Sequence, residues 1–218
     1  MMNKLRELNL RLTKESLKNE TARDVLIIQT IHTVDELIKI INKLVANIKE
    51  RYGYYAPRLC RSDDIEALLE GISKKVKEDI AIDMSNEDLS SVNEIANEII
   101  SLNKLLISQE EYLESLTNEL CPGTSKLATS LITARLIDHA GSLKHFAELP
   151  SSTIQVLGAE KALFRHLKTG ARAPKFGVIY NHENISKAAP SEKGKAARRL
   201  ASEISKSIKI DYFSKKNK

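Results

Sequence analysis

Two long stretches of the chain repeat apolar residues at alternating steps of three and four. This period keeps every repeated side chain on one stripe of a helix, which is the pattern of helices that wrap around each other. The sequence therefore predicts two long helices packed antiparallel along these stripes as a coiled-coil hairpin. The repeated positions are Ile27, Ile31, Val34, Ile38, Ile41, Val45 and Ile48, then Val92, Ile95, Ile99, Leu102, Leu106, Gln109, Leu113, Leu116 and Leu120.

The segments around the hairpin follow from the residues that interrupt the pattern. Residues 3–50 are predicted to form one helix, with a bend near 19–23, where the apolar pattern is weakest. Gly53 and Pro57 end that helix in a turn with three tyrosines, which we interpret as a packed corner rather than a base-stacking site. A shorter helix is predicted over residues 65–82 at the tip, and the polar residues 85–91 cap the next long helix.

A two-helix hairpin buries little apolar surface by itself, so it favours a second hairpin as its partner. Leu37 and Leu44 widen the apolar stripe of the first helix, which indicates a four-helix bundle between two chains, a homodimer. The alternative is packing against the tip helix of the same chain. The residues expected at the dimer interface are Ile31, Val34, Ile38, Ile41, Val45, Ile99, Leu102 and Leu106.

The charge of the chain is concentrated at its C-terminal end. Residues 158–218 carry 15 Lys and Arg against five Asp and Glu, a net charge of +10, whereas the whole chain carries +5. Residues 1–157 are therefore net acidic. Such asymmetry indicates that the C-terminal end binds a polyanion.

The spacing of these cations predicts a binding surface. Lys161, Arg165 and Lys168 fall on one face of a helix, opposite an apolar stripe of Leu163, Phe164 and Leu167. A basic loop follows, and a second basic helix begins after Pro190 with Ser191 as its N-cap. The alternative is a solvated charged face, but the cations lack the acidic partners that such faces usually carry. The residues expected to contact the polyanion are Gln155, Lys161, Arg165, Lys168, Arg172, Lys175, Lys187, Lys193, Lys195, Arg198 and Arg199.

A long segment resembles a known family. The run LITARLIDHAGSLKHFAELPSSTIQVLGAEKALFRHLKTGARAPKFGVIY, followed by AAPSEKGKAARRLA, is similar to the NOP domain of archaeal box C/D ribonucleoprotein scaffolds and their nucleolar and splicing-factor relatives. The resemblance implies an RNA-binding scaffold for guided 2′-O-methylation. It would dimerise through its coiled coil and bind the composite surface of a kink-turn guide RNA and a small kink-turn-binding protein. It also implies that Arg135, His139, Ala140 and Ser142 contact that protein.

The longer scaffolds of this family carry an N-terminal domain that docks the methyltransferase fibrillarin, and this sequence begins at the coiled-coil helix. We therefore do not carry fibrillarin recruitment over to this chain. The lysine-rich acidic repeats of nucleolar members are also missing, which favours an archaeal, cytoplasmic protein, or a nucleolar one if the source is eukaryotic. The alternative function is a dimeric interaction or assembly protein whose basic domain binds another RNA or protein.

The expected fold is all-α: a coiled-coil domain with a helical tip over 1–120, a compact helical NOP domain over 121–213, and a disordered basic tail over 214–218. Within the second domain we expect a continuous helix over 126–145 and at most one short β segment, at 176–180.

The sequence offers no catalytic constellation. The five histidines and two cysteines lack metal-ligand spacing, and no nucleotide-binding glycine loop is present. We therefore expect a binding protein rather than an enzyme, with no metal and no cofactor. No apolar run is long enough to cross a membrane.

Overall fold

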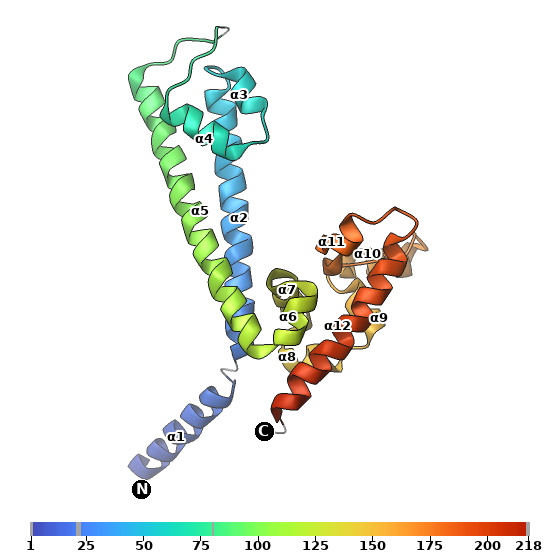
Figure 1. The fold of residues 1–218 in the computed structure, drawn as a ribbon. Coiled ribbons are helices and arrows are strands. Elements are labelled where there is room, and N and C mark those ends of the chain that lie inside the picture. The colour runs from blue at the N-terminus through green and yellow to red at the C-terminus, as the bar shows by residue number, and fades with distance from the viewer. Residues whose placement is uncertain (1, 21–22, 80, 217–218) are drawn as a thin grey trace. The chain divides into compact units, whose positions relative to one another are not determined.

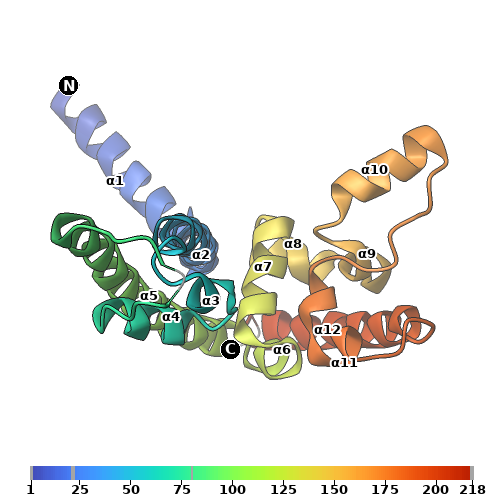
Figure 2. The same cartoon turned by 90° about the horizontal axis from the view of Figure 1, so that it is seen from above.

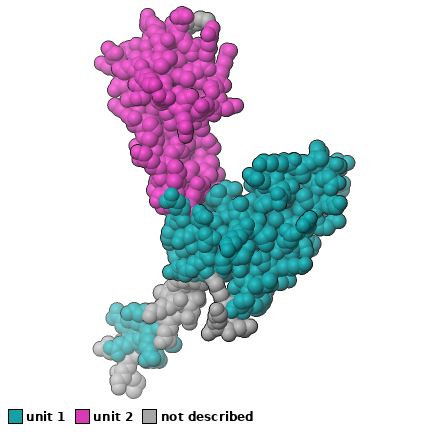
Figure 3. Space-filling model, in the orientation of Figure 1, with its two compact units in different colours: residues 1–32, 111–218 teal, residues 33–110 magenta. Residues whose placement is uncertain are grey.

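A computed structural model describes residues 2–20, 23–79 and 81–216, and within these the protein is helical, with no strand. The expected all-α class is confirmed. The chain divides into two compact units, residues 33–110 and residues 1–32 with 111–218 (Figure 3). The predicted boundary at residue 120, between a coiled-coil domain and a NOP domain, stays a prediction.

The predicted hairpin is formed by α2 (Arg23–Tyr52) and α5 (Asn86–Leu120), which run side by side (Figure 1). Two contacts establish the antiparallel direction: Arg23 pairs with Glu119, and Arg51 Nη2 donates to Ser91 Oγ over 3.4 Å. The repeated apolar positions form the buried stripe. Fully or nearly buried are Ile27, Ile31, Val34, Ile41, Val45, Ile48, Val92, Ile99, Leu113 and Leu116.

The N-terminal helix of the sequence prediction is divided in the structure. α1 covers Met2–Glu20 and α2 begins at Arg23, and the segment expected to bend, 19–23, includes residues 21–22, which lie outside the described residues. Leu5, Leu8, Leu10 and Leu12 of α1 are all more than half exposed.

The tip of the hairpin is formed by α3 (Pro57–Arg61) and α4 (Ile65–Ser73). Asp64 caps α4 by accepting from the Ala67 amide over 3.0 Å, as its acidic start predicts. The helix ends nine residues earlier than the expected residue 82, because Lys75 adopts a positive φ of 51° and the chain turns back. The tyrosine corner is largely confirmed: Tyr52 and Tyr55 are buried with ring centroids 5.5 Å apart, and Tyr54 is exposed.

Ser85 and Asp88 start α5 with a reciprocal cap. The Ser85 hydroxyl accepts from the Asp88 amide over 3.1 Å, and Asp88 Oδ2 accepts from the Ser85 amide and hydroxyl. These bonds hold the pKa of the Asp88 carboxyl below its ordinary value. The expected polar cap before the second long helix is therefore present.

The other unit is built on α12 (Lys193–Lys216), against which pack α6 (Pro122–Ala128), α8 (Leu143–Glu148), α9 (Ser151–Val156) and α11 (Glu183–Ser186). α12 buries one stripe, formed by Ala197, Leu200, Ala201, Ile204, Ser205 and Ile208. The helix begins at Lys193 rather than after a Ser191 cap, since the Glu192 carbonyl accepts the first helical bonds from Lys195 and Ala196. It continues through Lys216, so the expected disordered tail is helical to that residue, and 217–218 lie outside the described residues.

The helix expected over 126–145 is broken twice. α6 ends before Thr129, which has φ 69° and ψ 155°, and α7 (Ser130–Ala140) ends at Gly141 in the left-handed region with φ 81°. Ser142 then caps α8 by accepting from the His145 amide over 3.1 Å. The two breaks turn one amphipathic stretch into three short helices that surround Ile132, Leu136 and Phe146.

Two polar contacts join the first turns of α2 to α7 and α8. Asp24 Oδ2 accepts from the Leu143 amide over 2.8 Å, and His32 Nε2 lies 2.7 Å from Asp138 Oδ1. The two α2 residues are eight positions apart and therefore share one face of that helix.

Candidate nucleic-acid interface

The amphipathic helix α10 (Glu160–Thr169) lies at the edge of its unit, and a loop over residues 170–177 returns the chain from it (Figure 2). Lys161, Arg165 and Lys168 are exposed along one stripe, as predicted. The opposite apolar stripe is also exposed: no residue of α10 is buried, and Phe164 and Leu167 are 62% and 69% exposed. α10 therefore presents both faces to solvent instead of packing its apolar face.

Both ends of α10 are fixed by hydrogen bonds. Before it, Gly158 has φ 87° and donates its amide to Glu160 Oε1 over 2.7 Å. After it, Gly170 adopts φ 67° and donates to the His166 carbonyl over 2.8 Å, while the His166 imidazole contacts the Ala171 carbonyl. A left-handed glycine is a common helix end. The basic loop thus leaves the helix in a defined direction.

The loop is anchored to α9 at its far end. Gln155 Nε2 donates to the Lys175 carbonyl over 2.7 Å, the Gly177 amide donates to the Gln155 carbonyl, and the Val178 amide donates to the Leu157 carbonyl. The short β segment expected at 176–180 is not formed, because Val178–Asn181 is a 3₁₀ turn, η1. Only these two backbone bonds resemble strand pairing. Gln155 is therefore a loop anchor as well as an expected RNA contact.

Next to Lys175 lies an aromatic stack that the sequence reasoning missed. The rings of Phe176 and Tyr180 are 4.8 Å apart and 17° from parallel. Lys193 Nζ lies 4.8 Å from the centre of the Tyr180 ring and donates to its hydroxyl over 3.1 Å. The available signal was two aromatic residues four positions apart, in the segment whose composition predicts a short strand.

The loop and the start of α12 come together at Gly194. A side chain there would lie 3.8 Å from Lys175 Cδ, so the Lys175 side chain passes over this turn of α12. The structure therefore places Lys175 beside both Gln155 and the start of α12, where Lys193 lies. The loop connects this cluster to the cations of α10. Arg172 is exposed in the same loop.

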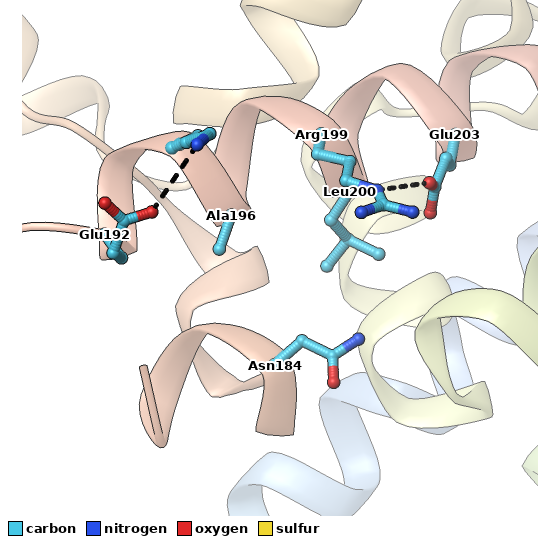
Figure 4. Close-up of a pocket in the computed structure, with 7 residues that line it drawn as sticks. Asn184, Glu192, Ala196, Arg199, Leu200 and Glu203 are labelled. Carbon is cyan, nitrogen blue, oxygen red and sulfur yellow. Dashed lines mark hydrogen bonds and ion pairs between the residues drawn. The ribbon is translucent and has the colours of Figure 1, made fainter. Parts of the chain in front are cut away.

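The remaining expected RNA-binding residues of α12 point in different directions. Consecutive helical residues are about 100° apart, so Arg198 and Arg199 face different sides. Lys195 and Arg199 line a groove of about 580 Å³ between α11 and α12, together with Asn184, Glu192, Ala196, Leu200 and Glu203 (Figure 4). Arg198 is exposed outside the groove.

The cations near the groove are paired with acids. Lys195 Nζ lies 3.9 Å from Glu192 Oε2, Arg199 Nε lies 3.1 Å from Glu203 Oε1, and Lys187 Nζ lies 3.2 Å from Glu183 Oε2. In contrast, Lys161, Arg165, Lys168, Arg172 and Lys175 make no ion pair with any residue that the structure describes. The expected RNA-binding residues therefore include cations that are paired with an acid, Lys187, Lys195 and Arg199, and cations that are not, such as those of α10 and the loop.

The residues expected to contact a protein partner lie at the end of α7. His139 is exposed and its Nδ1 lies 3.8 Å from Glu160 Oε1, so it adjoins the start of α10. Ala140 and Arg135 are half-buried, and the Ser142 hydroxyl is engaged as the α8 cap. His139 is the most exposed of the four, with 37% of its side-chain surface accessible.

The expected dimer residues are mostly enclosed by their own chain. Ile31, Val34, Ile41, Val45 and Ile99 are buried in the α2–α5 hairpin, and Ile38, Leu102 and Leu106 are half-buried. The exposed apolar residues of the hairpin are instead Leu26, Ile40, Ile100, Leu105, Ile107 and Tyr112. The heptad period alone does not tell whether a repeated position packs inside its own hairpin or against a second copy.

His182 joins α11 to α6. Its Nδ1 accepts from the Asn184 amide over 3.2 Å, so the 3.0 Å contact of Nε2 with the Leu127 carbonyl is a donation by the neutral imidazole. Among the described residues, no three His, Cys, Asp or Glu side chains converge as metal ligands, and no described helix is long and apolar enough to span a membrane.

Comparison with known proteins decides the family. Residues 60–218 match the Nop family model, described as a snoRNA-binding, fibrillarin domain. The chain belongs to the Nop family. It is 36% identical over 222 residues to human nucleolar protein 56 and 35% identical over 215 residues to the probable nucleolar protein 5-2 of Arabidopsis thaliana and to nucleolar protein 58 of Neurospora crassa. These alignments cover 86–88% of this chain but 37%, 40% and 36% of the relatives, so the Nop chain described here spans about two-fifths of their length.

A solved structure shares the fold. The crystal structure of a fibrillarin/Nop5p complex aligns with 96% of this Nop chain and 69% of its counterpart, at a TM-score of 0.56 and 24% identity. The reservation about fibrillarin finds no support in these comparisons, since both the family description and that complex include fibrillarin.

Proposed function

We propose that this Nop-family chain is an RNA-binding scaffold of a box C/D-type ribonucleoprotein. The observation that carries the proposal is the uncompensated surface of α10 and the 170–177 loop, called here the α10–loop face: Lys161, Arg165, Lys168, Arg172 and Lys175. Exposed cations without acidic partners release counterions when they meet phosphates, which is the main source of affinity for nucleic acid. The names of the relatives and the snoRNA-binding description of the family support the same reading.

The α10–loop face suits a structured RNA backbone. Lys161 and Arg165 are one helical turn apart, about 6 Å along the axis, which is close to the separation of successive phosphates. Contacts of this kind position a protein on RNA and carry little sequence information. Lys175 and the Phe176–Tyr180 stack lie at the end of this face, where a flat aromatic surface suits the terminal base pair of a stem.

We further propose that the RNA is bound together with a small kink-turn-binding protein. His139 lies beside Glu160 at the start of α10, so a protein seated on the end of α7 would adjoin RNA held by the α10–loop face. In this arrangement Ala140→Glu weakens binding to the RNA–protein composite and leaves the affinity for free RNA nearly unchanged. Equal loss on both substrates would show instead that α7 has been disrupted.

Dimerisation through the α2–α5 hairpin is also a proposal. The exposed apolar residues of the hairpin favour a second copy, because side chains such as Ile107 at 56% exposure gain free energy on burial. Ile40→Asp combined with Ile107→Asp, two exposed positions of the hairpin, is expected to abolish a dimer detected by sedimentation at micromolar concentration. A wild-type chain that sediments as a monomer would contradict dimerisation without affecting the RNA proposal.

Participation in guided 2′-O-methylation and recruitment of fibrillarin are proposed from the relatives and the solved complex. The chain would then act as a scaffold, with the methyl transfer performed by fibrillarin and no cofactor of its own. The named relatives are nucleolar proteins, so a nucleolar location is proposed for a eukaryotic source and a cytoplasmic one for an archaeal source.

The decisive experiment measures binding to kink-turn RNA by gel shift, with and without a kink-turn-binding protein. A scaffold binds the composite much more tightly than either component. The alternative, a dimeric assembly protein whose basic face binds another RNA or protein, gives equal and weak binding to the RNA in both conditions.

A further inference from the structure

The basic residues of α12 are divided between two sides of that helix, and only one side carries acids. The groove between α11 and α12 contains Lys195 and Arg199, each beside a glutamate one turn away, Glu192 and Glu203. Arg198 lies outside the groove, on the exposed side of α12. The following inference rests on the proposed function and concerns how the RNA is confined to one face.

We propose that Glu192 and Glu203 are specificity-determining residues that keep RNA phosphates out of the α11–α12 groove. The groove, with a volume of about 580 Å³, is lined by two cations, Lys195 and Arg199, and by the Asn184 side chain, which lies on α11 across from α12 (Figure 4). Without the two carboxylates it would be a second basic surface on the same unit.

The two glutamates act in two ways. Each lies beside a cation that a phosphate would contact and competes for it, with separations of 3.1 Å at Arg199 and 3.9 Å at Lys195. Each also places a negative charge beside any phosphate that enters, and like charges at contact distance discriminate strongly against the wrong ligand. The four charges lining the groove sum to zero, whereas the α10–loop face carries five uncompensated cations.

Confinement to one face has a functional reason. Two basic faces on one domain would bind any RNA duplex in several orientations, because phosphate contacts carry little sequence information. With the groove closed to phosphates, RNA approaches only the α10–loop face, beside the end of α7. The glutamates therefore contribute selectivity for the composite rather than affinity.

The test compares wild type with the double variant Glu192→Gln, Glu203→Gln on two RNAs, a kink-turn RNA with its binding protein and a plain duplex of equal length. Releasing Lys195 and Arg199 adds about two phosphate contacts, so affinity for the plain duplex rises and its salt dependence steepens. Between 50 and 200 mM salt the double variant loses roughly tenfold more duplex affinity than wild type. Adding Arg199→Ala to the double variant removes about half of the gain.

Glu148→Gln is the matched control, since it removes one exposed carboxylate at the end of α8, outside the groove. If the double variant changes duplex affinity no more than the control does per charge removed, or loses affinity, the inference is overturned. Glu203→Gln alone gives the same test at Arg199 without altering the start of α12. A wild-type chain that binds neither RNA overturns the proposed function itself, whereas wild-type binding with an unchanged double variant overturns only this inference.

Discussion

The carboxylate of Asp211, near the end of α12, accepts hydrogen bonds from both the amide and the hydroxyl of Thr124, each over 2.8 Å. It also accepts from the Gly123 amide over 3.1 Å. The Cys121 side chain at the N-cap of α6 makes no capping hydrogen bond, and Asp211, 87 positions after Thr124, caps this helix instead. These hydrogen bonds join α6, the first helix of the C-terminal segment, to α12, the last.

Asp211→Ala is expected to lower the free energy of unfolding by about 1–2 kcal/mol, because it leaves the first amides of α6 without their acceptor. Urea denaturation followed by circular dichroism measures this loss. Lys209→Ala, an exposed change in the same helix, should remain within about 0.5 kcal/mol of wild type. Equal effects of the two variants would contradict the capping role.

Thr129→Gly is expected to stabilise the protein, although glycine usually destabilises. Thr129 has φ 69° and ψ 155°, a conformation that is strained for a β-branched residue and easy for glycine. The relieved strain, about 1–3 kcal/mol, exceeds the roughly 0.5–1 kcal/mol of added chain entropy.

Thermal and urea unfolding of Thr129→Gly measure the difference. Ser152→Gly, at an exposed position inside α9, serves as the comparison and should destabilise by about 0.5–1 kcal/mol. A loss of stability in Thr129→Gly would show that the turn between α6 and α7 is not strained.

Tyr52 should make the stability of residues 33–110 depend on alkaline pH. Its hydroxyl donates to the Val76 carbonyl over 2.8 Å and to the Gly71 carbonyl over 3.3 Å, and burial raises its pKa from 10.0 to about 12. A raised folded-state pKa means that the contribution is complete below pH 10 and is lost as pH rises towards 12.

Tyr52→Phe should remove that part of the alkaline dependence and cost about 1–3 kcal/mol at neutral pH by leaving the Val76 carbonyl without its Tyr52 donor, while the Gly71 carbonyl keeps the Val76 amide as a donor over 3.0 Å. Unfolding free energies measured from pH 8 to pH 11.5 report both effects. Tyr54→Phe is the control, since Tyr54 is 63% exposed. Parallel pH profiles for wild type and Tyr52→Phe would contradict the assignment.

Arg165→Ala should weaken binding of the RNA–protein composite and flatten its salt dependence by about one phosphate contact, a slope change of roughly 0.7–0.9. The effect should be similar for RNAs that keep the fold and change the sequence. Lys175→Ala should behave likewise but also depend on stem length, because Lys175 adjoins the aromatic stack. Lys74→Ala, a change at an exposed lysine of the tip, controls for net charge.

The sequence predicted the parts of the fold in which one helix period persists. The hairpin stripes from Ile27 to Ile48 and from Val92 to Leu120 became the buried faces of α2 and α5, and the basic stripe of α10 is exposed as expected. The breaks at Thr129 and Lys75 were not predictable, because a positive φ at these residues runs against their local preference and is imposed by tertiary packing.

The sequence indicated which residue types the candidate site contains but not how their side chains are arranged. The cation count places the candidate site in the C-terminal segment, and the structure shows which of those cations lack acidic partners. The pairing of Arg199 with Glu203 and of Lys195 with Glu192 depends on which side of α12 faces α11. The Phe176–Tyr180 stack depends on a 3₁₀ turn in a segment whose apolar and aromatic composition predicts a strand. The exposure of Phe164 and Leu167 followed from no sequence pattern, since a stripe of this kind normally packs inward.

The contact between Gly177 and Leu157 limits how the loop could have changed over time. A Cβ atom at residue 177 would lie 1.9 Å from the Leu157 carbonyl oxygen, so no other amino acid fits without separating the loop from α9. Gly170, at the other end of the loop, meets no atom within 4 Å and is restricted only by its φ of 67°, a conformation that asparagine also adopts. The structure therefore tolerates more than one residue type at position 170, next to α10. At position 177, near Lys175, it requires glycine for the backbone contact with Leu157.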